Sequence, residues 1–142
     1  MLELSCHCGL VRLTVEQRPD YINACNCTLC CKTGARWGYF PQSLVAVHGP
    51  TATYRRTDKA DPVAQIHFCG ACGTTTHFTL TAEAVARFGQ DLTGVNMRLA
   101  DERDLAGIEL RYPDGYAWSG AGEFGYVRAA RIIGRGTASG ER

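Results

Sequence analysis

The stretch Cys25-Asn26-Cys27-Thr28-Leu29-Cys30-Cys31 gathers half of the cysteines of this chain into one short segment. The others form two groups, Cys6-His7-Cys8 and Cys69-Gly70-Ala71-Cys72. In a reducing compartment, close-set cysteines more often hold a metal than form disulfides, and a secreted disulfide scaffold is the alternative. The three groups therefore predict a fold in which zinc ions link distant parts of the chain.

The composition around these groups is that of an ordinary globular domain. The chain has 142 residues, of which 45% are hydrophobic and 20% charged, and its formal net charge is +1. These values exclude a disordered chain, and the near-neutral balance argues against a nucleic-acid partner. No apolar run approaches the ~20 residues of a membrane span, and residues 1–6 lack the features of a secretory signal. We therefore expect a cytoplasmic protein with no membrane partner.

Most segments have the pattern of short strands. Val11, Leu13 and Val15 alternate with polar neighbours, as in a strand with one buried face. Other strand-like segments, rich in β-branched or aromatic residues, are 36–40, 44–47, 53–56, 65–68, 75–80, 95–99 and 108–112. The sequence thus predicts a mainly β fold of short antiparallel strands stapled by zinc.

Helical patterns are few. Thr81 is a suitable cap for a helix over 82–88 that ends at Gly89, and 101–106 has the length of one short turn; loops are the alternative in both places. Glycines become frequent from Ser119 onward. We predict one zinc domain over 1–118 and a Gly-rich extension over 119–142, in which 127–133 forms a strand or helix and the last residues are loose.

Four cysteines predict a closed metal site. Cys69 and Cys72 flank a tight turn that Gly70 and Gly73 allow, whereas a thioredoxin-like redox pair would need a βαβ pattern. Cys6 and Cys8 share one face of an extended segment, so His7 points away. Cys6, Cys8, Cys69 and Cys72, hereafter the quartet, would surround one structural zinc and leave no position for a substrate.

Cys25, Cys27 and Cys30, hereafter the trio, predict a different kind of site. Three thiolates leave one position of a tetrahedral zinc open to water or to an incoming thiolate, which is the arrangement of a catalytic zinc. Cys31 adjoins Cys30, and neighbouring side chains diverge, so we interpret Cys31 as a free or packing thiol. The alternative is a second closed site in which Cys31 or a histidine is the fourth ligand.

Other residues are candidates for supporting roles at the trio. The nearest cations in sequence are Lys32 and Arg36, and either of them can also be ordinary surface charge. Trp37, Tyr39 and Phe40 either wall the site or pack in the core. The histidines His48, His67 and His77 are candidate proton donors by residue type alone.

The three groups resemble those of the glutathione-dependent formaldehyde-activating family, which includes centromere protein V. The resemblance is carried by Ser5-Cys6-His7-Cys8-Gly9, by Cys25-Asn26-Cys27-Thr28-Leu29-Cys30, by Phe68-Cys69-Gly70-Ala71-Cys72-Gly73-Thr74 and by the later stretches 94–99 and 104–115. It implies a β-tent fold with two zinc ions, in which the quartet is structural and the trio catalytic. Cys31 departs from the family pattern, which has a basic residue at that position.

The family resemblance also implies a reaction. It predicts a carbon–sulfur lyase that forms or cleaves a thiol–aldehyde adduct such as S-hydroxymethylglutathione, with glutathione and a small aldehyde as partners. Two other functions use the same residues: a carrier that binds glutathione or another small thiol without turnover, and a zinc-stapled module that binds another protein. Exposed strand edges would be compatible with a homodimer.

Overall fold

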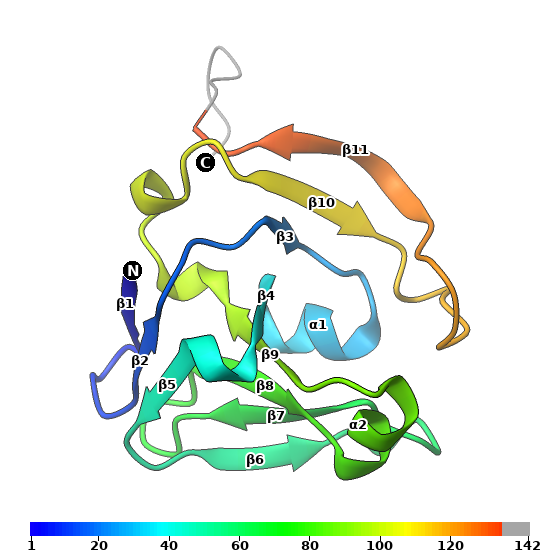
Figure 1. Ribbon diagram of the computed structural model, residues 1–142, viewed down its shortest axis with the longest axis horizontal. Helices are drawn as coiled ribbons and strands as arrows, with labels where there is room; N and C mark the ends of the chain where they lie inside the picture. The colour runs from blue at the N-terminus through cyan, green and yellow to red at the C-terminus, as the bar shows by residue number, and fades with distance from the viewer. Residues whose placement is uncertain (135–142) are drawn as a thin grey trace.

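A strongly bent β-sheet forms the main body of the molecule. Figure 1 shows the computed structural model, which describes residues 1–134. The large sheet has the strand order β11-β10-β3-β4-β9-β8-β7-β6, and β1, β2 and β5 form a separate small sheet. The bounds of the strands are β1 (Leu2–Ser5), β2 (Arg12–Val15), β3 (Tyr21–Asn23), β4 (Trp37–Pro41), β5 (Val45–His48), β6 (Ala52–Arg55), β7 (Ala64–Phe68), β8 (Thr75–Leu80), β9 (Leu92–Asn96), β10 (Glu109–Pro113) and β11 (Tyr126–Ile132).

The bend of the large sheet creates two wings with a helix between them. In Figure 1, β3, β10 and β11 lie across the top and β9 to β6 lie along the bottom, with α1 (Thr28–Thr33) enclosed between them. All pairings are antiparallel except that of β3 with β10. The mainly β prediction is therefore confirmed, and this two-winged sheet gives the fold its tent-like form. Among residues 1–134, no helix has the length and apolar character needed to cross a membrane.

Two apolar clusters fill the space on either side of the sheet. The larger one joins the small sheet to the upper wing through residues such as Leu13, Ile22 and Leu110, and it includes the buried cysteines Cys6 and Cys69. The smaller one contains Trp37 and Phe78, and Cys30 packs against it. Each cysteine group is thus attached to a different core cluster.

The sequence located most strands but missed two strands and one α-helix. The eight strand-like segments all contain strands, although the segment 95–99 ends early because Met97–Leu99 form a 3-10 turn, η2. β1, β3 and α1 were not expected. The capped helix was confirmed as α2 (Ala82–Phe88), with Thr81 and Gly89 as its caps, and the turn at 101–106 as a 3-10 turn, η3 (Glu102–Leu105).

The segment that follows residue 118 returns to the sheet. β11 pairs with β10 along its length, so the strand alternative holds for 127–132, and Ile133 is buried against the larger core cluster. The domain boundary at residue 118 stays a prediction. The expectation of a loose chain end falls on residues 135–142, which lie outside the described residues.

Candidate metal centres

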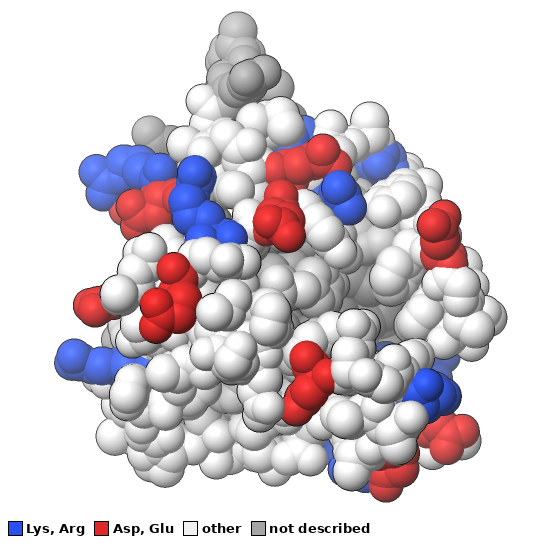
Figure 2. Space-filling view, viewed as in Figure 1, with Lys and Arg blue, Asp and Glu red and all other residues white. Residues whose placement is uncertain are grey.

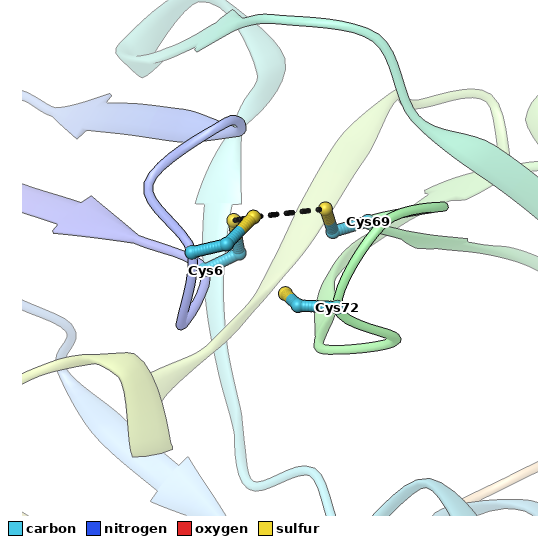
Figure 3. A group of neighbouring side chains, drawn as sticks. Cys6, Cys69 and Cys72 are labelled. Atoms are coloured by element: carbon cyan, nitrogen blue, oxygen red, sulfur yellow. Dashed lines mark hydrogen bonds between the residues drawn. The ribbon is translucent and has the colours of Figure 1, made fainter.

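The quartet brings two turns together. Figure 3 shows Cys6, from the turn after β1, pointing toward Cys69 and Cys72, from the turn between β7 and β8. The four sulfurs lie within 4.8 Å of one another. Cys8 Sγ is 3.6 Å from Cys6 Sγ and 3.7 Å from Cys69 Sγ. A tetrahedral zinc with Zn–S bonds of about 2.3 Å needs sulfurs roughly 3.8 Å apart, so this donor set fits zinc.

Each half of the quartet is held by local backbone bonds. Gly9 N–H donates to Cys6 O, which closes the first turn, and Gly73 N–H donates to Cys69 O in the second. Cys6 and Cys8 therefore converge in a turn and not on the extended segment that the sequence suggested. Gly73 has a φ of 78°, the left-handed conformation that favours glycine. Cys6 and Cys69 are buried while Cys8 and Cys72 are exposed, so one side of the site faces solvent.

The trio converges at the start of α1. Its three sulfurs also lie within 4.8 Å of one another, and all three residues are half-buried. Cys27 is the N-cap of α1, and its sulfur accepts a hydrogen bond from Cys30 N–H over 3.3 Å. A cysteine is an unusual cap, which is why no helix was expected here. Three soft sulfur donors that no fourth ligand joins among residues 1–134 fit a zinc with one open position.

Hydrogen bonds point toward the sulfurs of the trio from several sides. Cys27 N–H donates to Cys25 Sγ over 3.4 Å, and the indole Nε1–H of Trp37 donates to Cys30 Sγ over 3.3 Å. Hydrogen bonds with the sulfurs of Cys25 and Cys30 lower the pKa of Cys27, while hydrogen bonds with the sulfurs of Cys25 and Cys27 raise the pKa of Cys30. A cation bound among the three sulfurs would favour the thiolate form of each of them.

Cys31 lies outside this arrangement. Its thiol is exposed and donates to Asn26 O over 3.4 Å. It does not belong to the sulfurs that converge. The side chains of Cys30 and Cys31 therefore diverge, in agreement with the interpretation of Cys31 as a thiol outside the trio.

The loop after β10 forms a wall of the trio that the sequence did not predict. Asn26 Nδ2 donates to Asp114 Oδ1 over 2.9 Å, and Asn26 Oδ1 accepts from Tyr116 N–H over 2.9 Å. These bonds press Gly115 against the site, where an added Cβ would collide with Cys25 Sγ. The surface in Figure 2, seen from the same side as in Figure 1, is hollowed near its centre, in the region where α1 lies in Figure 1.

Among residues 1–134, the cation whose charge acts on the trio is Arg56, and not Lys32 or Arg36, the two candidates from the sequence. Arg56 Nε and Nη2 donate to the carboxylate of Asp58 over 2.7 and 2.8 Å, and the charge of Arg56 contributes to the lowered pKa of Cys27. Lys32 is exposed in the last turn of α1. Arg36 lines a separate cavity with Met97 and Leu110.

Tyr39 is the polar aromatic residue beside the trio. It packs against the same core cluster as Cys30, and its hydroxyl accepts a hydrogen bond from Asn23 Nδ2 over 3.0 Å. Burial raises its pKa, and the nearby thiols of Cys30 and Cys25 add to this. Asn23 Oδ1 is buried and has no hydrogen-bond partner among residues 1–134. Trp37 also walls the site, while Phe40 belongs to the larger core cluster.

The candidate histidines do not join the trio. His67 and His77 stack on each other with ring centroids 4.2 Å apart, and their ring nitrogens bond to the hydroxyls of Thr51, Thr76 and Thr79. His48 lies at the end of β5 in the small sheet. Within the described part of the chain, no hydrogen bond links these three histidines to a cysteine.

Comparisons with known proteins found a family model, a curated relative and a solved structure that are similar to this chain. A family model described as "Glutathione-dependent formaldehyde-activating enzyme" matches residues 1–107. A protein of Halomonas elongata, provisionally named as a glutathione-dependent formaldehyde-activating enzyme, is 35% identical over 83 residues. That alignment covers 52% of this chain and 53% of the relative, so the chain spans about half the length of this curated relative.

A solved structure has a similar fold. The crystal structure of a Rhodobacter sphaeroides protein superposes with a TM-score of 0.58 at 25% sequence identity. The superposition covers 75% of this chain and 97% of the other. The fold is therefore shared over three quarters of this chain.

Proposed function

The chain belongs to the glutathione-dependent formaldehyde-activating enzyme family, and from this membership we propose that it is a zinc-dependent carbon–sulfur lyase. The reaction would form or cleave a thiol–aldehyde adduct such as S-hydroxymethylglutathione. The observation that carries this proposal is the trio, in which three sulfurs converge and no fourth ligand joins them among residues 1–134. In this proposal, Cys6, Cys8, Cys69 and Cys72 hold a structural zinc, and Cys25, Cys27 and Cys30 hold a catalytic zinc.

Zinc bound by the trio would supply a Lewis acid that keeps an incoming thiol ionised near neutral pH. The chain's own residues prepare the trio for that ion. The backbone N–H of Cys30 and the indole N–H of Trp37 donate to ligand sulfurs, which fixes the directions of Cys27 and Cys30. Arg56 offsets negative charge beside Cys27. Such outer contacts orient ligands and tune a metal site.

Tyr39 supports the aldehyde half of the reaction. Because its hydroxyl oxygen accepts from Asn23, the phenolic proton remains available to a substrate oxygen. Its raised pKa keeps that proton in place, so Tyr39 acts as a hydrogen-bond donor to the oxygen of the adduct. The buried Asn23 Oδ1 beside it offers an acceptor for a hydroxyl group.

The loop that contains Gly115 supports the thiol half. Its backbone closes one side of Cys25 and leaves no room for a side chain there. Asn26 fixes the loop from the segment that carries the ligands. Holding thiol and aldehyde together in such a walled site removes much of the entropic cost of a bimolecular step.

The partners and the cellular setting are part of the same proposal. We propose glutathione and formaldehyde as substrates and the cytoplasm as the location, where all eight unpaired cysteines would remain reduced. The homodimer remains a prediction, as does the absence of nucleic-acid and membrane partners.

Exchange spectroscopy by NMR tests the proposed activity. In a mixture of glutathione and formaldehyde, the zinc-loaded protein should raise the exchange rate between free glutathione and the adduct in proportion to its concentration. The Cys27→Ser variant, which keeps the quartet, is the matched control and should leave the rate at its uncatalysed value. Binding of glutathione without a change in exchange would favour the carrier function. Absence of any thiol binding would favour the protein-interaction module.

A further inference from the structure

A cavity separate from both cysteine groups lies between the start of β4 and the turns that follow β9. Its volume is about 130 Å³. Its apolar lining comes from Ile22, Met97, Leu105, Leu110 and Ile133, all of which belong to the larger core cluster. Its charged lining comes from Arg36, Arg98 and Glu102. The cavity thus joins an apolar floor to a predominantly cationic edge.

Arg36 enters this cavity with an unsatisfied hydrogen-bond donor. Its backbone is fixed, because its N–H donates to Asn96 Oδ1 over 3.2 Å and its carbonyl accepts from Met97 N–H over 2.7 Å. Its Nε is buried, and among residues 1–134 it has no hydrogen-bond partner. A guanidinium remains charged in proteins, so a half-buried one without a counterion carries an uncompensated desolvation cost.

The surrounding charges make the cavity favourable for a monoanion. Arg98 lines the same cavity, and its guanidinium has no ion pair within 4.0 Å in the described part of the chain. Glu102 is 72% exposed, and its Oε1 lies 3.9 Å from Arg131 Nη2, which partly offsets its charge. Figure 2 shows Lys and Arg side chains gathered beside the short turns between β9 and β10. Two arginines and one glutamate give the lining of the cavity a formal charge of about +1. A ligand with one negative charge neutralises this lining, whereas a ligand with two would leave it negative.

The cavity is independent of the trio. Arg36 and Trp37 are neighbours on an extended segment, so their side chains point to opposite faces. Trp37 contacts Cys30 in the smaller core cluster, whereas Arg36 joins residues of the larger one. A ligand of this cavity would therefore not occupy the proposed zinc site.

We propose that this cavity binds a small organic carboxylate with a short aliphatic chain. The carboxylate lies between Arg36 and Arg98, which can each donate two parallel hydrogen bonds to it. The aliphatic chain lies against Met97, Leu105 and Ile133. The anion supplies an ion pair to Arg36, which makes none within 4.0 Å among residues 1–134, and its apolar part fills space that water occupies poorly.

Titration with sodium butyrate tests this site. The zinc-loaded full chain is placed in a buffer free of other carboxylates and of phosphate, and binding is followed by calorimetry and by amide NMR shifts. We expect saturable binding, with the largest shifts near Arg36, Met97 and Arg98. Neutral butyramide and inorganic phosphate should bind at least about tenfold more weakly, because one lacks the charge and the other lacks the chain.

Two variants distinguish binding in this cavity from binding elsewhere on the protein. Arg36→Met should weaken butyrate binding at least about tenfold and raise the unfolding temperature in the same buffer without butyrate, because it removes an uncompensated buried charge. Arg103→Met is the matched control: its side chain is 89% exposed and pairs with Asp101, so both properties should stay unchanged. If Arg36→Met binds butyrate as tightly as the unaltered protein, the proposal is overturned. This result is expected if butyrate binds to zinc at the trio. Equal binding of butyramide, or no saturable butyrate binding, would overturn it as well.

Discussion

The indole Nε1–H of Trp37 donates a hydrogen bond to Cys30 Sγ over 3.3 Å. The ring of Trp37 also packs edge-on against Phe78, with centroids 4.9 Å apart. Trp37 therefore belongs both to the core and to the wall of the trio, and the two interpretations of its role in the sequence are compatible.

Replacing Trp37 by Phe should weaken the metal affinity of the trio by about tenfold, because the N–H···S bond is lost while an aromatic ring remains. Competition with a chromophoric chelator measures this affinity. Trp118→Phe is the control, since its indole N–H donates to Gly122 O and not to a cysteine sulfur. An unchanged affinity in Trp37→Phe would show that the hydrogen bond does not tune the site.

The two cysteine groups should respond differently to single substitutions. The protein should carry close to two zinc ions, one of which a mild chelator removes without unfolding. Cys27→Ser should lose that labile ion and keep the fold, whereas Cys69→Ser should lose the fold, because Cys69 is buried in the larger core cluster. Metal analysis combined with circular dichroism measures both. One ion or none in the unaltered protein would refute the assignment of two sites.

Tyr39→Phe should lower the exchange rate at saturating substrate about tenfold to a hundredfold, because it removes a hydrogen bond to the adduct oxygen. The affinity for glutathione should stay the same, since the ring still packs against Tyr21 and Phe78. Tyr21→Phe is the matched control and should leave the rate unaltered. A Tyr39→Phe protein with full activity would remove Tyr39 from the proposed mechanism.

Gly115→Ala should disturb the trio while leaving the quartet intact. The new methyl group would collide with Cys25 Sγ, so the labile zinc and the exchange activity should both be lost. Gly125→Ala in the same loop is the control, because no atom lies within 4 Å of its added Cβ. If Gly115→Ala retains two zinc ions, the loop can move to accommodate the methyl group and the prediction is wrong.

His77 should make stability depend on pH. Burial, followed by the charge of His67, lowers the pKa of His77 to about 4, whereas a histidine in the unfolded chain titrates near pH 6.5. The contribution is complete above pH 6.5. Between pH 6.5 and 4 only the unfolded chain binds the proton, so the free energy of unfolding should fall by roughly 3 kcal/mol.

Denaturant unfolding at several pH values measures this slope, and His77→Asn should flatten it. Acid also removes zinc by protonating its sulfur ligands, but this loss affects both proteins and cancels in the comparison. Identical slopes in the two proteins would contradict the prediction.

The cysteine groups could be predicted because the spacing of ligands within each group is a local property of the sequence. The contact of Asn26 with Asp114 could not, because 88 residues separate the two and no local pattern of the sequence pairs them. Arg56 was missed for the same reason. Arg36 was expected near the trio because it follows it in sequence, but one step along a strand reverses the face on which a side chain lies.

The sulfurs of Cys8 and Cys69 lie 3.7 Å apart, although 61 residues separate these two cysteines in the sequence. During synthesis at about 5–20 residues per second, the first two ligands of the quartet leave the ribosome several seconds before the last two. A nascent chain therefore holds half of a zinc site that nothing can yet complete. If the quartet binds zinc as proposed, we expect its loading to wait until the second turn has emerged.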